Sequence, residues 1–222
     1  MTQAQTQQAR FEAWQARFSC IGALLADFGL DAASFLNGLD LVQHGCRQAW
    51  LAGVMTGFNG NLSVRLGKDL MLVTASGIAK GHMEDGDVAL ATKEGSPLAG
   101  PALSSETAMH AAVYEARPEA RCVLHTHPGC LLALSVKLAG RLDRMLDMPL
   151  FEAAMWRPKL AIAGAYPPGS HRLADSVGKA AGKAPAVFME GHGLCTAGAG
   201  IAEALGITEQ MEHLAEIQLR LL

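Results

Sequence analysis

Three histidines in this chain stand where their side chains could hold one metal ion. His125 and His127 lie two residues apart after the apolar run Cys122–Leu124, and His192 follows a predicted buried strand at residues 186–190. An apolar run leading into His-x-His indicates a strand, and side chains at positions i and i+2 of a strand leave the same face. Three imidazoles that leave one coordination position open suit zinc or a similar divalent ion. The spacing therefore predicts a metal pocket that performs chemistry.

Glu106 is the candidate acid or base. It follows Ser104 and Ser105, and this segment opens a predicted helix that runs through Glu115. The carboxylate could simply stabilise the helix start, because serine is a preferred N-cap and the first turn favours negative charge. Alternatively, a glutamate beside a metal pocket could ligate the metal at rest and take a proton when substrate displaces it. His110 lies four residues later on the same helix face and is interpreted as a structural histidine.

Two glycine-containing turns could bind an anion. Residues 56–61 read Thr-Gly-Phe-Asn-Gly-Asn before a predicted strand, and residues 74–77 read Thr-Ala-Ser-Gly at the end of another. The first turn lacks the lysine of a P-loop, so it is not a Walker motif. Free backbone amides and asparagine side chains could cradle a phosphate there. An ordinary loop explains the first segment equally well, and the default interpretation of the second is a turn that ends a strand.

The elements that must position these residues alternate between helices and strands. Helical patterns cover residues 1–38, 41–51, 104–115, 131–138, 171–182 and 201–222. Strands are predicted at residues 62–65, 70–74, the His-x-His run and 186–190, and residues 95–101 are expected to form a loop. Residues 141–166 show no clear pattern. Interleaved strands and helices in one chain are typical of an α/β layered domain.

The composition limits the partners and the compartment. The chain has 222 residues, half of them hydrophobic, and its 18 Lys and Arg against 21 Asp and Glu give a net charge of −3. Without a basic run, this balance argues against generic nucleic-acid binding. No apolar stretch reaches the roughly 18 residues of a membrane span, and the first ten residues do not resemble a signal peptide. Five scattered cysteines predict reduced thiols and a cytoplasmic protein.

Five motifs, taken in order, resemble the class II aldolase/adducin superfamily. They are Gly60–Arg65; Val73–Gly77; Ser104–Glu106 with Met109 and His110; Val123–His127; and Glu190–Gly193, and they span roughly residues 41 to 220. The resemblance implies an α/β fold, a three-layer α/β/α domain around a largely antiparallel central sheet. It divides the chain into an N-terminal helical extension, residues 1–38, and a class II aldolase/adducin-like catalytic domain, residues 39–222.

The resemblance also implies roles for the site residues. By similarity, His125, His127 and His192 hold the metal, which is zinc or another divalent ion, and Glu106 is the acid/base and a candidate fourth ligand at rest. The residues that would bind the phosphate of a small-molecule substrate are Asn59, Asn61, Ser76, Gly77, Ser104 and Ser105. Family members are usually cyclic homotetramers with sites at subunit interfaces, so the same assembly is expected here.

The reaction that the resemblance implies is that of a fuculose-1-phosphate aldolase. Such an enzyme reversibly cleaves a phosphorylated ketose to dihydroxyacetone phosphate and an aldehyde through a metal-stabilised enediolate, with Glu106 moving the proton. Aldolases of this group often use a tyrosine as a second acid, and the matching segment Met148–Met155 contains none. Phe58 also replaces a residue that is usually small or hydroxylated. The alternatives are a decarboxylase of a phosphorylated sugar acid, a methylthioribulose-phosphate dehydratase and, least favoured, a non-enzymatic adducin-like interaction module.

Overall fold

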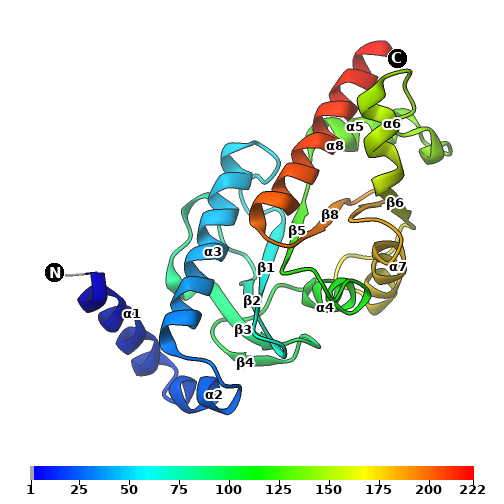
Figure 1. The fold of residues 1–222 in the computed structure, drawn as a ribbon. Helices are drawn as coiled ribbons and strands as arrows, with labels where there is room; N and C mark the ends of the chain where they lie inside the picture. The colour runs from blue at the N-terminus through cyan, green and yellow to red at the C-terminus, as the bar shows by residue number, and fades with distance from the viewer. Residues whose placement is uncertain (1–2) are drawn as a thin grey trace.

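The computed structural model describes residues 3–222, and these residues form an eight-stranded central sheet (Figure 1). The strands are β1 (Asn61–Leu66), β2 (Leu70–Thr74), β3 (Val88–Thr92), β4 (Pro97–Ala99), β5 (Cys122–Thr126), β6 (Leu160–Ala163), β7 (Ala186–Met189) and β8 (Gly193–Gly198). Their order across the sheet is β4-β3-β2-β1-β5-β8-β7-β6. Neighbouring strands are antiparallel except for β6 and β7. The mixed α/β fold and the largely antiparallel sheet are therefore confirmed.

Both faces of this sheet carry helices. The helices of the described chain are α1 (Gln3–Arg17), α2 (Ile21–Asp27), α3 (Ala32–Leu51), α4 (Thr107–Ala116), α5 (Gly129–Lys137), α6 (Phe151–Trp156), α7 (His171–Ala181) and α8 (Ile201–Leu221), of which α3, α4, α7 and α8 contact strands. On β5, Leu124 joins a core that includes α3 and α8, whereas Val123 joins one that includes α4 and α7. Because successive side chains of a strand leave opposite faces, both faces of β5 are buried. This explains why the run before His125 is apolar throughout.

Four strands are not predicted by the sequence pattern. The edge strand β4 lies inside the segment 95–101 that was expected to be a loop, and β3, β6 and β8 have no counterpart among the predicted strands. β8 reads Gly-Leu-Cys-Thr-Ala-Gly, which has few of the β-branched and aromatic residues that favour strands. It is a strand because it pairs with both β5 and β7 and is buried along its whole length. Tertiary pairing overrides local preference there.

The N-terminal helices pack directly against the rest of the chain. Trp14 meets Phe35 of α3 edge-on, with ring centroids 5.0 Å apart. Arg10 lies 2.7 Å from carboxylate oxygens of both Asp40 and Asp85, which ties α1 to α3 and to the segment before β3. The expected boundary between the N-terminal extension and the catalytic domain, at residue 38, falls inside α3. The division of the chain into these two parts stays a prediction. Residues 1 and 2 of the expected extension lie outside the described residues.

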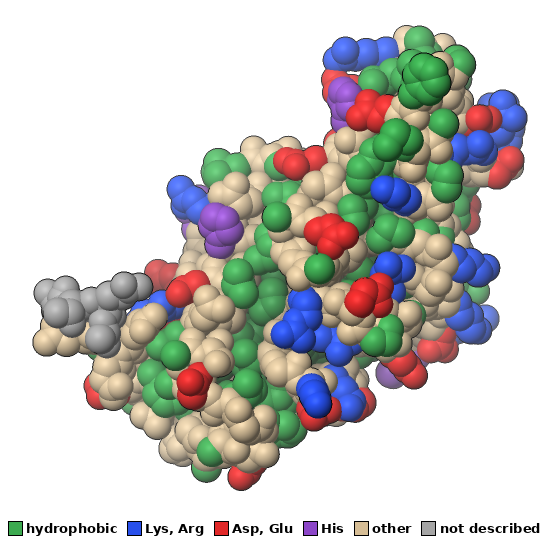
Figure 2. Space-filling view, in the orientation of Figure 1, with side chains coloured by type: hydrophobic (Ala, Val, Ile, Leu, Met, Phe, Trp, Pro, Cys, Tyr) green, Lys and Arg blue, Asp and Glu red, His purple; other side chains and the backbone are tan. Residues whose placement is uncertain are grey.

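The surface carries hydrophobic side chains at one end of the molecule. Figure 2 shows them where α6 and the last turns of α8 lie, and they include Phe151, Met155 and Leu221. Phe151 is 95% exposed. Clustered apolar side chains on a surface mark sites of interaction. Among the described helices, none combines the length and the apolar character that crossing a membrane requires.

Candidate metal centre and active site

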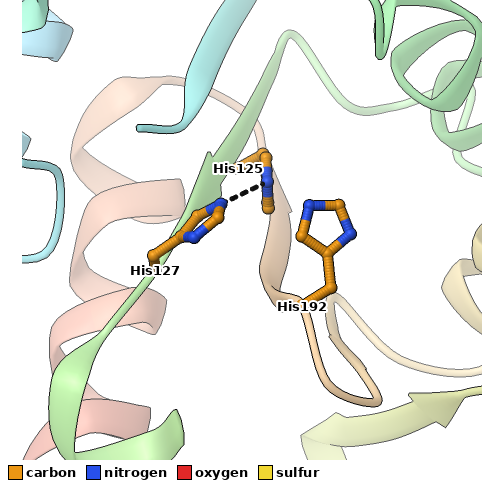
Figure 3. Close-up of side chains that lie close together, drawn as sticks. All are labelled: His125, His127 and His192. Atoms are coloured by element: carbon orange, nitrogen blue, oxygen red, sulfur yellow. Dashed lines mark hydrogen bonds between the residues drawn. The ribbon is translucent and has the colours of Figure 1, made fainter. Parts of the chain in front are cut away.

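The three histidines meet where two neighbouring strands come together (Figure 3). His125 lies in β5, His127 lies one residue beyond its end, and His192 lies in the turn between β7 and β8. Because β5 and β8 are antiparallel neighbours that pair Thr126 with Leu194, the turn that carries His192 lies beside the end of β5. One ligand atom from each of the three imidazoles can be chosen so that all lie within 4.8 Å of one another. The fold thus brings together all three predicted metal ligands.

The arrangement of His125 fits a metal ligand. Its Nδ1 atom lies 3.0 Å from the carbonyl oxygen of Leu194. A carbonyl oxygen only accepts, so Nδ1 carries a hydrogen, and this hydrogen bond leaves Nε2 facing the pocket as the atom for a metal. That Nε2 atom lies 3.0 Å from Nε2 of His127. Two ring nitrogens at this distance need a shared proton or a shared cation, and the donor set suits a divalent ion such as zinc.

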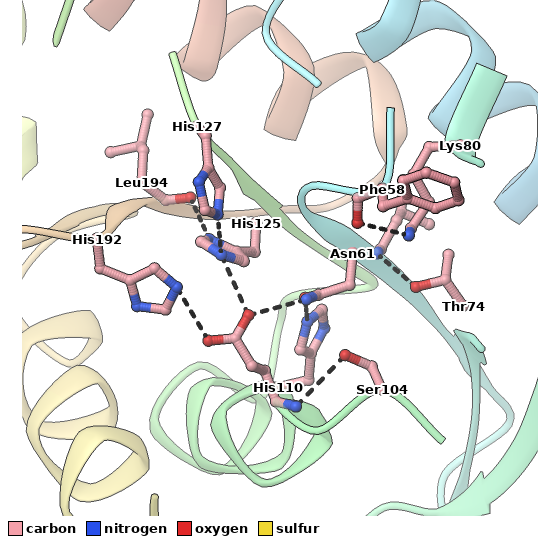
Figure 4. A network of polar contacts seen from close by, with 12 residues as sticks. Phe58, Asn61, Thr74, Lys80, Ser104, His110, His125, His127, His192 and Leu194 are labelled. Carbon is pink, nitrogen blue, oxygen red and sulfur yellow. Dashed lines mark hydrogen bonds and ion pairs between the residues drawn. The ribbon is translucent and has the colours of Figure 1, made fainter. Parts of the chain in front are cut away.

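Glu106 faces the same pocket from the start of α4, and Figure 4 shows His125, His127 and His192 around this pocket. One carboxylate oxygen lies 3.2 Å from Nε2 of His125, and the other lies 3.3 Å from Nε2 of His192. The Asn61 amide donates to the first of these oxygens at 3.0 Å. The side chain makes no hydrogen bond that caps α4. Of the two interpretations of Glu106, the geometry favours the carboxylate beside the metal pocket over the helix cap.

Burial and neighbouring groups set the protonation of the pocket. Burial lowers the pKa of His127 to about 4, and it also lowers the pKa of His192. Burial alone would raise the pKa of Glu106, but the interactions with His125 and Asn61 outweigh it and lower that pKa to about 2. At neutral pH the pocket therefore offers uncharged imidazoles at His127 and His192 and an ionised carboxylate, the protonation states that ligate a divalent cation.

The metal-free protein is expected to lose stability as the pH falls below about 6.5. Folding lowers the pKa of the buried His110 to about 3 and that of His127 to about 4, whereas both lie near 6.5 in the unfolded chain. Between these values only the unfolded chain binds the protons, so acid favours unfolding. Below about 4.5, Glu106 acts in the same direction, because its folded pKa is also lowered. Urea titrations of the chelated protein across this range measure the effect, and a constant free energy of unfolding would contradict it.

The predicted anion-binding residues lie on three chain segments that contact one another. The backbone N–H of Lys80 donates to the carbonyl of Gly57 at 3.1 Å, which joins the turn at residues 56–61 to the turn after β2. The N–H of Ser76 donates to the carbonyl of Ala102 at 3.0 Å, which joins the second turn to the segment before α4. Asn61 and Ser104 are buried next to Glu106, and the exposed members of the set are Asn59, Ser76, Gly77 and Ser105.

Lys80 is a candidate site residue that the sequence pattern does not predict. Its ammonium group donates to the carbonyl oxygens of Phe58 at 3.3 Å, in the first turn, and of Ile78 at 2.9 Å, directly after the second turn. The side chain is only 2% exposed, and burial lowers its pKa. A cation at this junction favours a bound anion nearby. Its only sequence signal is a lysine that follows the Ser76–Gly77 turn by three residues.

Related proteins share this chain's fold and most of its length. The family described as Class II Aldolase and Adducin N-terminal domain matches residues 40–219. A 3-oxo-tetronate 4-phosphate decarboxylase from Haemophilus influenzae is 31% identical over 179 residues, covering 80% of this chain and 84% of the relative. An L-fuculose phosphate aldolase from Methanococcus maripaludis is 31% identical over 163 residues, covering 73% of this chain and 85% of the relative. Other relatives are named as methylthioribulose-phosphate aldolases or dehydratases.

A solved structure agrees with these relatives. The L-fuculose-1-phosphate aldolase from Thermus thermophilus superposes with a TM-score of 0.69 at 25% sequence identity, covering 82% of this chain and 94% of that protein. Because the match covers 82% of this chain, the likeness concerns the fold rather than one motif.

Proposed function

Because this chain belongs to the class II aldolase and adducin family, we propose that it is a metal-dependent aldolase that reversibly cleaves a phosphorylated ketose to dihydroxyacetone phosphate and an aldehyde. The observation that carries the proposal is the position of Glu106, whose two carboxylate oxygens lie 3.2 Å from His125 and 3.3 Å from His192. An acid/base group is thereby held at the metal pocket. The relatives named as L-fuculose phosphate aldolases support the same substrate class.

The other site residues would bind the metal and the phosphate of the substrate. His125, His127 and His192 would hold the metal, and zinc suits their nitrogen donors. A bound metal of this kind supplies a Lewis acid that draws electron density from a substrate carbonyl. The phosphate would bind at the contacting turns, to Asn59, Asn61, Ser76, Gly77, Ser104 and Ser105, with the charge of Lys80 between the turns. Holding the phosphate there orients the reacting carbon toward Glu106.

Glu106 would move the proton at the reacting carbon. In the metal-free site, interactions with His125 and Asn61 lower the pKa of this carboxylate, although its burial acts in the opposite direction. A substrate that displaces the carboxylate from this position removes the lowering interactions and leaves the burial in place. The pKa then rises, and the carboxylate becomes a stronger base when substrate is bound.

A decarboxylase of a phosphorylated sugar acid is the second candidate. The relative named as a 3-oxo-tetronate 4-phosphate decarboxylase favours it, and so does the segment Met148–Met155, which offers no tyrosine to protonate an aldehyde oxygen. A dehydratase of methylthioribulose phosphate would use the same site and is supported by a relative of that name. A non-enzymatic adducin-like role has the least support, because all three histidines and Glu106 meet in one pocket.

Proton exchange tests the aldolase proposal without knowledge of the aldehyde. Zinc-loaded protein incubated with dihydroxyacetone phosphate in heavy water is expected to exchange one hydroxymethyl proton stereospecifically, because cleavage and its reverse share the step that Glu106 catalyses. Proton NMR follows the exchange, and a chelated sample is the control. A zinc-loaded protein that shows no exchange would contradict an aldolase and direct attention to phosphorylated sugar acids and methylthioribulose phosphate.

We propose a cytoplasmic homotetramer with its sites at subunit interfaces. The exposed apolar end that includes Phe151 and Met155 offers a surface for a neighbouring chain.

The five cysteines are free thiols, and Cys46, Cys122 and Cys195 are buried, as expected for a reducing compartment. Sedimentation equilibrium and cell fractionation test the two parts, and a monomer in solution would contradict the assembly.

A further inference from the structure

A ladder of polar side chains runs from the metal pocket into the core between β1 and α4. Two residues of a strand span about 6.6 Å and four residues of a helix about 6 Å, so side chains at these spacings stay in step. The strand contributes Asn61, Ser63 and Arg65, and the helix contributes Glu106, His110 and Tyr114. Asn61, Ser63, Glu106, His110 and Tyr114 are almost wholly buried. The ladder therefore lies in the core, and its outer end is the proposed acid/base.

The contacts alternate between the two elements along the ladder. The Asn61 amide donates to Glu106 at 3.0 Å, and Nε2 of His110 lies 2.5 Å from the Asn61 amide oxygen. On its other side, Nδ1 of His110 lies 2.7 Å from the Ser63 hydroxyl. That hydroxyl lies 3.0 Å from the hydroxyl of Tyr114. Figure 4 shows Asn61 next to His110 in the first part of the ladder.

The chemistry of Glu106 and Asn61 fixes the direction of the hydrogen bonds at the outer end of the ladder. The Glu106 carboxylate only accepts, so the NH2 group of Asn61 faces it and the amide oxygen of Asn61 faces His110. That oxygen also only accepts, so His110 carries its hydrogen on Nε2. Nδ1 then accepts the hydroxyl hydrogen of Ser63, and the Tyr114 hydroxyl donates to the backbone carbonyl of Ser63. Burial lowers the pKa of His110 to about 3, which keeps the ring neutral as this scheme requires.

We propose that His110 is a positioning residue for the acid/base: by donating from Nε2 to Asn61, it holds the Asn61 amide with its NH2 group toward Glu106. Without this donor, the amide of Asn61 is free to turn over and present its oxygen to the carboxylate, which would repel it. The ladder thus keeps the carboxylate aimed at the metal pocket through a contact between two buried side chains, His110 and Asn61. The inference rests on the proposed acid/base role of Glu106.

The first test uses the wild-type, metal-loaded protein. Long-range nitrogen–proton NMR of protein labelled with ¹⁵N in histidine distinguishes a protonated ring nitrogen from an unprotonated one. Near neutral pH, His110 is expected to show a protonated Nε2 and an unprotonated Nδ1. A ring protonated on Nδ1, or on both nitrogens, would overturn the proposal whatever the catalytic activity. Because this measurement needs no variant at His110, it decides the matter even if substitutions there impair folding.

The second test separates positioning from packing. His110→Phe, which keeps a ring but no donor, is expected to lower kcat about 10- to 100-fold with bound metal retained, the range typical of groups that orient a site from behind. His110→Gln, whose amide can still donate to Asn61, should recover part of the loss. Equal losses in the two variants would mean packing alone and would overturn the proposal.

Two comparisons complete the design. In an Asn61→Ala background, adding His110→Phe should cost little further activity if His110 acts through Asn61, and a fully additive loss would contradict that route. Glu106→Gln is assayed in parallel. If it abolishes turnover while His110→Phe leaves turnover unchanged, the positioning inference fails and the proposed function stands. If Glu106→Gln itself turns over normally, the proposed function fails, and with it the inference that depends on it.

Discussion

Replacing His125 by alanine is expected to remove the bound metal and to lower turnover by about a thousandfold or more. The ring provides Nε2 as a metal ligand. The hydrogen bond from its Nδ1–H to the Leu194 carbonyl already holds the ring in place, so the ring loses little further conformational freedom when the metal binds. A metal that polarises a substrate carbonyl contributes several kcal/mol, and each 1.4 kcal/mol or so is worth a factor of ten in rate. Elemental analysis of the purified variant gives the metal content, and steady-state kinetics give the turnover.

His213→Ala is the matched control for this variant, because it removes an imidazole from an exposed position on α8. It should keep both metal and activity. The His125 variant should instead resemble the chelated wild-type protein in both respects. If His125→Ala retained one equivalent of metal per chain, the pocket of three histidines would not be the metal centre, and the assignment of His127 and His192 would fall with it.

Replacing Glu106 by glutamine is expected to lower kcat by about 10²- to 10⁴-fold while most of the metal is retained. The amide has nearly the same shape as the carboxylate but cannot take a proton, so it removes the general acid/base contribution. The three histidines remain to hold the metal, since together they provide three of the ligands. The exchange of dihydroxyacetone phosphate protons should disappear in parallel with turnover, because both need the same proton transfer.

The result for Glu106→Gln separates two roles of the carboxylate. Loss of turnover with metal retained indicates a proton carrier. Loss of both indicates that Glu106 is required as a ligand, as its distances of 3.2 Å to His125 and 3.3 Å to His192 would allow. Turnover at the wild-type rate with metal in place would show that another group moves the proton, and the proposed mechanism would be wrong.

Several features of this protein follow from the sequence alone because they depend on local periodicity. The apolar run into His125 predicts β5, and the spacing of His125 and His127 places both imidazoles toward one pocket. The two serines before Glu106 predict the start of α4, which the structure places at Thr107. The order of five short motifs identifies the family, whose match to residues 40–219 confirms the resemblance. Each single motif or spacing occupies only a few residues of the chain.

Only the tertiary structure decided how the pieces meet. β8 has weak strand preference of its own, and it forms because β5 and β7 enclose it, which brings His192 to the end of β5. Lys80 joins two turns that are separated along the chain, and His110 reaches Asn61 only because α4 lies along β1. These contacts depend on burying long-range neighbours together, a free-energy gain that no short window of sequence records. The sequence therefore determined which groups could do the chemistry, and the packing of distant segments decided which of them are held in position to do it.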